Sequence, residues 1–149
     1  MVFDGDCSFC IYWIIKWKKI SADSIAYVSY QEAHNSFKDI SIESFKEAVR
    51  LIETDGTVFS GADAAYYTYY LKGKFKFLHL WYQKYHWFKR LSDFIYRWIA
   101  KRRNFMFKLS VTLFGTHPEK PNKNWMIFLL ALFLIIALAT YNLTSTSKL

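Results

Sequence analysis

Cysteine, proline and glycine are scarce in this chain of 149 residues, which has two, two and five of them. Two cysteines three positions apart exclude a disulfide-stapled secreted scaffold, because a structural bridge stabilises a protein chiefly by closing a long loop. The length excludes two full catalytic domains. Apolar residues make up 53% of the chain and aromatic residues 21%, and so much apolar surface excludes intrinsic disorder. We therefore expect one domain, or one domain with an anchor.

Acidic residues are nearly absent from one part of the chain. Residues 72–108 have 11 Lys or Arg and a single acid, Asp93, whereas residues 1–71 have 6 Lys or Arg and 10 Asp or Glu. The net charge of +8 is therefore local. The chain does not open on a basic and then apolar stretch, so the sequence predicts no secretory signal peptide.

Charge is missing altogether between Asn124 and Ser147. The stretch 125–141 is strongly apolar, and as a helix it would extend about 25 Å, slightly less than the ~30 Å hydrocarbon core of a bilayer. The sequence therefore predicts a transmembrane helix over residues 124–143, followed by a short tail at 144–149.

Lys and Arg are more numerous before this predicted span than after it. Because positive residues stay on the cytoplasmic side, we expect a single-pass membrane protein whose N-terminal domain is cytoplasmic. Residues 117–123, which include both prolines, are the predicted linker. Residues 147–149 spell a peroxisomal address and residues 142–144 a glycosylation acceptor. We discount both, because one lies across the predicted membrane from its cytosolic receptor and the other lies too close to the membrane.

The body of the chain alternates patterns typical of strands and helices. Up to residue 59 the expected elements are a strand end at 1–3, a helix at 8–20, a strand at 25–30, a helix at 42–49, and strands at 50–54 and 57–59. A further helix follows. This order predicts an α/β fold in which residues 1–71 form a thioredoxin-like core, with a mixed sheet packed between helices.

Two local patterns support this order of elements. Asp55 and Gly56 favour a two-residue hairpin, because this pair readily adopts positive φ values. Ser60, Gly61 and Asp63 are expected to form a capping box for the next helix. Ser41 is expected to cap the helix that it precedes.

The two cysteines form a Cys-x-x-Cys motif at the start of the first predicted helix. Free backbone N–H groups and the helix dipole favour an anion there, so we expect the pKa of Cys7 to lie below the ordinary value of about 8.5. Cys7 is the predicted nucleophile, and Cys10, one turn along and facing inward, is the predicted resolving thiol. Two alternatives stay open: a pair of buried structural thiols, and a metal site with further ligands such as His34.

Two carboxylates and a glycine come directly before the motif. Asp4 and Asp6 oppose a thiolate on Cys7 by their like charge, yet either carboxylate could accept the proton of Cys10. Asp6 could instead simply cap the helix. Gly5 is expected to serve backbone geometry.

Three segments of the chain have marked patterns: Phe3–Cys10, Asp55–Ala64 and Tyr96–Arg103. Together they resemble the DCC family of predicted thiol-disulfide oxidoreductases, whose patterns are FYDGDCPxC, DGxxxxGxxA and YxxxAxxR. The resemblance covers about residues 1–105. It implies a thioredoxin-like fold with Cys7 and Cys10 as the redox pair, and it implies no particular substrate.

The chain departs from the expected pattern in its prolines. Ser8 stands where many members of the family have proline, which is one of the residues that tune the redox potential. The wider thioredoxin superfamily also places a cis-proline beside its disulfide, whereas Pro118 and Pro121 both lie in the predicted linker. Peptide binding in the usual thioredoxin manner is therefore not expected.

Residues 72–116 combine aromatic rings with Lys and Arg, and we expect two or three helices that complete the domain. The favoured interpretation is that this segment lies on an anionic membrane surface, with lipid as its partner. Single-stranded nucleic acid is disfavoured as a partner, and an ordinary aromatic core with a solvated basic face is the plain alternative. The predicted membrane-surface residues are Lys101, Arg102, Arg103 and Lys108.

The sequence thus predicts a membrane-tethered thiol-disulfide oxidoreductase, acting as a reductase or redox relay in the cytosol. Its partners would be a protein or small-molecule disulfide or thiol. No flavin or nicotinamide motif is visible, and we expect no cofactor and no metal. The alternative is a non-enzymatic membrane adaptor or soft-metal-binding protein that binds a partner through the basic aromatic segment.

Overall fold

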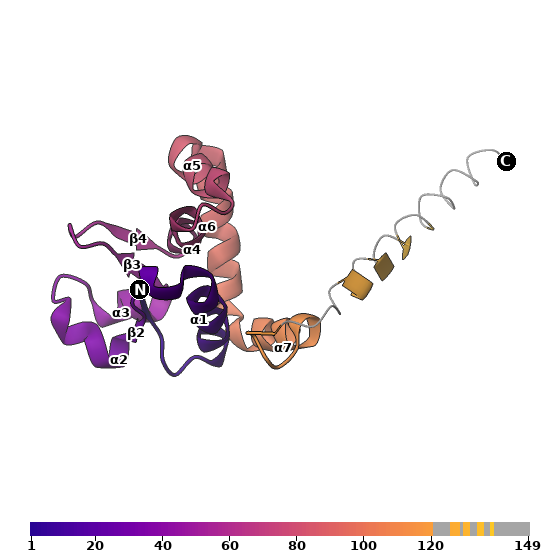
Figure 1. The fold of residues 1–149 in the computed structure, drawn as a ribbon, viewed down its shortest axis with the longest axis horizontal. Helices are drawn as coiled ribbons and strands as arrows, with labels where there is room; N and C mark the ends of the chain where they lie inside the picture. Colours follow the sequence, from indigo (N-terminus) through magenta and orange to yellow (C-terminus); the bar gives the residue numbers. More distant parts are fainter. Residues whose placement is uncertain (121–125, 129, 132–133, 136–137, 139–149) are drawn as a thin grey trace. The chain divides into compact units, whose positions relative to one another are not determined.

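The computed structural model describes residues 1–120, 126–128, 130–131, 134–135 and 138 (Figure 1). The chain divides into two units, Met1–Phe107 and Lys108–Leu149. All the functional residues discussed below except Lys108 belong to the first unit.

Strands and helices are interspersed up to α4, and among the described residues only helices follow. In order they are β1 (Val2–Phe3), α1 (Ser8–Ser21), β2 (Val28–Ser29), α2 (Tyr30–Ala33), α3 (Ile42–Glu47), β3 (Arg50–Ile52), β4 (Val58–Ser60), α4 (Ala62–Leu71), α5 (Lys76–Lys84), α6 (His86–Lys101) and α7 (Arg103–Phe114). Short 3-10 helices follow α1 at Ala22–Ser24 and α2 at His34–Ser36.

The four strands form one mixed sheet in the order β2-β1-β3-β4. β1 runs parallel to β2, with Val2 opposite Val28, and antiparallel to β3, with Val2 opposite Arg50. β1 is therefore an interior strand, and the chain leaves it directly into the turn that leads to the cysteines. The predicted mixed α/β architecture is confirmed in this part of the chain, and it is consistent with a thioredoxin-like fold.

The core lies between the sheet and helices α1 and α4, which pack against each other (Figure 1). Ile14 of α1 and Ala64 of α4 are almost fully buried, at 3% and 0% exposure. The cluster of buried residues is completed by Met1, Ile25 and Leu51. The apolar spacing along α1 turns one face of this helix toward the sheet, which fixes the direction in which its N-terminal cysteines point.

The β3–β4 hairpin has a longer loop than its sequence predicts. Glu53 N–H donates to Thr57 O at 2.9 Å, and Gly56 N–H donates to Glu53 O at 3.1 Å. Gly56 has φ +88°, but Asp55 is not in the left-handed region. The two-residue hairpin predicted at Asp55-Gly56 is therefore wrong, because a type I′ turn needs positive φ at both positions.

The caps of two helices differ in how well they were predicted. Ser41 caps α3, and its hydroxyl accepts a first-turn N–H at 3.2 Å, as predicted. The capping box predicted at Ser60 and Asp63 is wrong, because the N-cap of α4 is Gly61, at φ +59° and without a side-chain hydrogen bond. Asp63 instead binds His79 of α5.

Three helices, α5, α6 and α7, occupy the basic aromatic segment, in agreement with the predicted two or three. α5 packs against both α4 and α6. Residues 72–107 belong to the same compact unit as residues 1–71.

The predicted transmembrane helix needs correction. A membrane span requires about 20 consecutive apolar residues in one helix, and no described helix is both long and apolar enough to cross a membrane. Much of 124–143 and all of 144–149 lie outside the described residues, as does 121–123 of the linker. The predicted fold class is thus wrong in its transmembrane helix, and the single-pass localisation with a cytoplasmic domain is wrong with it.

Candidate active site

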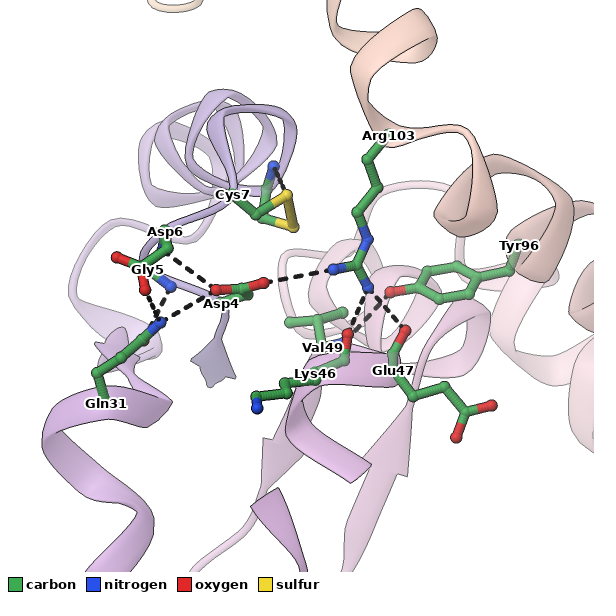
Figure 2. The surroundings of a disulfide bond; sticks show 11 residues. Asp4, Gly5, Asp6, Cys7, Gln31, Lys46, Glu47, Val49, Tyr96 and Arg103 are labelled. Atoms are coloured by element: carbon green, nitrogen blue, oxygen red, sulfur yellow. Dashed lines mark hydrogen bonds and ion pairs between the residues drawn. A yellow bond between two sulfur atoms is a disulfide. The ribbon is translucent and has the colours of Figure 1, made fainter. Parts of the chain in front are cut away.

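Cys7 and Cys10 lie at the first turn of α1 and form a disulfide (Figure 2). Cys7 is the N-cap residue, with extended backbone angles, and its Sγ accepts the backbone N–H of Cys10 at 3.1 Å. The Cα atoms of the two cysteines are 5.2 Å apart, a separation typical of disulfides. The first turn of α1 has no acidic side chain. The Cys7 sulfur is thus placed at the positive end of the helix dipole.

The Asp4-Gly5-Asp6 turn before the disulfide is held by one side chain of α2. Gln31 Nε2 donates to Asp4 Oδ1 at 3.1 Å and to Asp6 Oδ2 at 3.0 Å, while its Oε1 accepts the Gly5 N–H at 3.0 Å. A Cβ on residue 5 would lie 2.9 Å from Ser29 Cβ, so only glycine allows this close approach. The Asp6 side chain serves this contact, and the alternative in which Asp6 caps α1 is wrong.

Arg103, the first residue of α7, ties the same turn to the end of α3. Its Nη1 donates to Asp4 Oδ2 at 3.4 Å, and its Nη2 donates to the backbone carbonyls of Lys46 at 2.6 Å and Glu47 at 2.9 Å. Figure 2 shows the Arg103 side chain pointing toward all three groups. The side chains of Arg103 and Asp4 are only 24% and 17% exposed, so this ion pair is partly shielded from solvent.

Tyr96 of α6 is the second long-range support of the site. Its hydroxyl accepts the backbone N–H of Val49 at 3.2 Å, and burial raises the pKa of the Tyr96 phenol. The Tyr96 ring also lies over Gly61, where a Cβ would come within 3.2 Å of the ring. α6 is therefore fastened at Tyr96 to the chain on either side of the β3–β4 hairpin.

An apolar pocket of about 200 Å³ lies beside the disulfide. Cys10 is one of its lining residues, and Asp4 and Arg103 also border it. Most of the remaining lining is aromatic or aliphatic, and all of it except Phe3 of β1 and Val49 comes from α1, α3, α4, α6 and α7. The site therefore combines a disulfide, a buttressed acidic turn and an apolar recess.

A family model described as DCC1-like thiol-disulfide oxidoreductase matches residues 1–109. The chain belongs to this family. No curated protein and no solved structure matches the chain.

The three segments that resemble the DCC family meet in the structure of this DCC1-like chain. The first carries the acidic turn and both cysteines, the second includes Gly61, and the third begins with Tyr96 and ends with Arg103. Tyr96 contacts the second segment at Gly61, and Arg103 contacts the first at Asp4. The family pattern thus corresponds to one connected structure around the disulfide.

Three supporting residues of this DCC1-like site were not predicted as such. Tyr96 and Arg103 are visible in the sequence only as the ends of the YxxxAxxR segment, and the position of Arg103 among basic residues favoured a membrane surface. No pattern in the sequence signals Gln31, whose importance comes from the fold alone.

The two aspartates of the Asp55–Ala64 segment form their hydrogen bonds away from the cysteines. Asp55 Oδ1 accepts the Thr57 N–H at 2.8 Å within the hairpin loop. Asp63 is buried between helices, where its two carboxylate oxygens bind His79 Nδ1 and Gln83 Nε2, both at 2.8 Å. These contacts hold α4 to α5 and support the domain.

The predicted membrane-surface residues differ in their surroundings. Arg103 binds Asp4, as described above, whereas Lys101 and Lys108 are exposed. Arg102 is also exposed, and its guanidinium lies 4.7 Å from the centre of the Trp98 ring. The membrane-surface role of these four residues stays a prediction. Within the described part of the chain, no three His, Cys, Asp or Glu side chains are grouped so that they could hold a metal ion.

Proposed function

We propose that this protein reduces disulfides, as a reductase or as a relay between two thiol couples, and that Cys7 and Cys10 carry the two electrons. In the reduced protein, the Cys7 thiolate attacks one sulfur of a substrate R–S–S–R′, and R′–S⁻ leaves and takes up a proton. Cys10 then gives up its proton and attacks Cys7 Sγ, which releases R–S⁻. The substrate gains two electrons, the cysteine pair loses them, and a thiol or protein dithiol restores the reduced pair.

The position of Cys7 at the N-cap of α1 is the observation that supports this assignment of roles. The sulfur accepts a helix N–H at 3.1 Å, and a hydrogen bond of this kind favours the charged form of the acceptor. The dipole of a helix of 14 residues acts in the same direction. We therefore expect the Cys7 thiol of the reduced protein to ionise below its ordinary pKa of about 8.5.

Asp4 is our candidate for the group that takes the proton of Cys10. Asp4 and Cys10 line the same pocket, and three partners fix the Asp4 carboxylate, with Gln31 and the Asp6 N–H at one oxygen and Arg103 at the other. A carboxylate held in this way is a positioned general base. It acts in the second step, when Cys10 must become a thiolate in order to attack the mixed disulfide.

The geometry of the cysteine pair supports electron flow from the protein to the substrate. The folded backbone holds the Cα atoms of Cys7 and Cys10 5.2 Å apart, within reach of a disulfide. Folding therefore favours the bonded form of the pair, which lowers its reduction potential. The negative charges of Asp4 and Asp6 oppose a thiolate at Cys7 and act in the same direction, whereas the helix N-terminus favours that thiolate and acts in the opposite one.

Single-turnover oxidation of the full-length protein tests the proposal. The protein is reduced, freed of reductant and mixed with glutathione disulfide, and quenched samples are alkylated and weighed by mass spectrometry. We expect the wild type to lose both thiols, and Cys10→Ser to accumulate a glutathione adduct on Cys7. Ser24→Ala, at an exposed position of the 3-10 helix after α1 and outside the motif, is the matched control and should react as the wild type does.

The roles of the two sulfurs are tested by comparing the single variants. Cys7→Ser should form adducts on Cys10 far more slowly than Cys10→Ser forms them on Cys7, because only Cys7 lies at the helix N-cap. Equal rates for the two variants would refute the assignment. A wild-type protein that keeps both thiols in excess disulfide would refute the proposed function itself.

A further inference from the structure

The pocket beside the disulfide has a chemical character that limits what could occupy it. Its lining is dominated by aromatic and large apolar side chains, among them Phe9, Trp13, Trp17, Phe45, Ile99 and Met106. The pocket is continuous with the reactive site, because Cys10 lines it and the Cα atom of Cys7 is 5.2 Å from that of Cys10. A group held in the pocket would therefore lie next to Cys10, whose sulfur is bonded to that of Cys7.

Three polar side chains of the lining, those of Asp4, Tyr96 and Arg103, are already engaged. Asp4 and Arg103 pair with each other and with Gln31 or backbone carbonyls, and the Tyr96 hydroxyl accepts the N–H of Val49. A polar ligand group in this pocket would lose its hydrogen bonds to water with little to replace them, which is unfavourable. An apolar group would gain from the transfer out of water.

The size of the pocket indicates one ring. An apolar cavity of about 150 Å³ is large enough to bind benzene, and this pocket measures about 200 Å³. Pockets for drug-sized ligands are larger, at roughly 300–1,000 Å³. A single phenyl group attached to a short linker therefore fits the space.

A second hollow of this domain has several charged side chains in its lining. It is lined by Lys46, Arg97 and Lys101, among others, and it also meets Tyr96, Ala100 and Arg103. Neither cysteine lines this hollow. The recess that reaches the disulfide is the apolar one.

We propose that the pocket selects the substrate, and that the substrate is a small disulfide with an apolar aromatic group on the sulfur that Cys7 attacks. This inference rests on the proposed function, because it names the substrate class of the same reaction. With benzyl 2-hydroxyethyl disulfide as the probe, Cys7 forms a mixed disulfide with the benzyl sulfur, and 2-mercaptoethanol leaves. Cys10 then attacks Cys7 Sγ and releases benzyl mercaptan, so that the pair is oxidised and the probe is reduced to two thiols.

The test measures which of the two sulfurs of this probe is attacked by Cys7. Reduced, full-length Cys10→Ser is mixed with the probe, and mass spectrometry measures the ratio of benzylthio to hydroxyethylthio adducts on Cys7. The same probe with N-acetylcysteine gives the ratio in the absence of a pocket. We expect the protein to favour the benzyl adduct about tenfold relative to N-acetylcysteine, because the ring enters an apolar site. Equal ratios for the protein and for N-acetylcysteine would overturn the inference.

Variants with a larger side chain in the pocket test whether the pocket causes the preference for the benzyl adduct. Ala65 and Ala100 are small residues of its lining, on α4 and α6. In the Cys10→Ser background, Ala65→Leu and Ala100→Leu should bring the adduct ratio down to that of N-acetylcysteine. Ala26→Leu, at an exposed position outside the pocket, is the matched control and should keep the selectivity. If both filling variants fold by circular dichroism and keep the wild-type ratio, the pocket is not the selecting site.

A redox-free measurement separates this inference from the proposed function. Toluene should bind the oxidised wild-type protein in saturation-transfer NMR and should bind Ala65→Leu much more weakly. If no adduct of either kind forms but toluene binds in this way, the proposed function fails and the pocket stands as an apolar binding site. If adducts form without selectivity and toluene does not bind, the oxidoreductase stands and the inference about its substrate fails.

Discussion

Gly56 and Gly61 both have positive φ, at +88° and +59°, but different neighbours. A Cβ at Gly56 would meet nothing within 4 Å, whereas one at Gly61 would lie 3.2 Å from the Tyr96 ring. Gly56→Ala should therefore cost only the backbone strain of the left-handed region, about 1–2 kcal/mol. Gly61→Ala should cost more, because the Tyr96 ring must also move. Urea unfolding of the two variants measures the difference, and equal losses would show that the contact with Tyr96 contributes nothing.

Arg102 and Arg103 are adjacent arginines with different partners. Arg103 is partly buried and binds Asp4 and two backbone carbonyls, whereas Arg102 is exposed and lies over Trp98. Arg103→Ala should lower the free energy of unfolding by about 2 kcal/mol, because it removes charge-assisted hydrogen bonds and leaves Asp4 without its partner. Arg102→Ala is the matched control, and its effect should lie within about 0.5 kcal/mol. Similar losses for both variants in urea unfolding would contradict the bridging role of Arg103.

The contact between α4 and α5 depends on the buried carboxyl group of Asp63. Burial raises the pKa of Asp63 above its ordinary value of 3.8, and the hydrogen bond and charge of His79 offset this only in part. In the hairpin loop, hydrogen bonds from Thr57 lower the pKa of Asp55 below the same value. The two carboxyl groups should therefore titrate on opposite sides of 3.8. Carbon-detected NMR of the side-chain carboxyls measures both in one titration.

The raised pKa of Asp63 makes the stability of the folded protein depend on pH. Above pH 3.8 an unfolded Asp63 has lost its proton, while the folded carboxyl still holds one until its raised pKa is passed. The free energy of unfolding should therefore fall as pH rises through this window. Asp63→Asn should remove that slope, whereas Asp55→Asn should remove an opposite one, in which stability is lost as pH falls below 3.8. An Asp63 that titrates below 3.8 would refute the assignment.

Most elements were predictable from local pattern, and the errors arise where a partner elsewhere in the fold decides the outcome. The apolar repeat of α1 predicts residues 8–20, and the helix ends at Ser21. The second strand was predicted over 25–30 but pairs only at Val28–Ser29, because its neighbour β1 is itself only two residues long. The length of a strand depends on its partner, which a sequence pattern does not contain.

The capping box at α4 shows a second limit of local pattern. Ser60 and Asp63 have the spacing of a cap, yet the Asp63 carboxylate binds His79, sixteen positions further along the chain. A buried partner on another helix outcompetes the N–H groups of the first turn. Such a preference becomes visible only once the packing of α4 against α5 is known.

Only those residues of the site that lie close together in the sequence could be predicted from it. Cys7 and Cys10 are three residues apart, and the spacing alone indicates their chemistry. Asp4 and Arg103 are 99 residues apart, and their contact depends on the complete fold. The same basic cluster that includes Arg103 suggested a membrane surface, since charge pattern does not distinguish a solvated arginine from one that turns inward.

The cysteine pair should couple the stability of the whole domain to its redox state. The disulfide closes a loop of only a few residues, so it should stabilise the folded protein by no more than about 2 kcal/mol. The reduced protein should therefore keep its far-ultraviolet circular dichroism and unfold cooperatively at slightly lower urea.

Because the redox states of the folded and unfolded chains form a thermodynamic cycle, a folded protein that is more stable when oxidised has a lower reduction potential than its unfolded chain. A reduction potential that is lowered by folding is expected of a reductase. Urea unfolding with and without excess dithiothreitol measures it, with the Cys7→Ser, Cys10→Ser double variant as a control that should not respond to the reductant. A protein that is more stable when reduced would be an oxidant, and it would reverse the proposed direction of electron flow while leaving the roles of the two sulfurs unchanged.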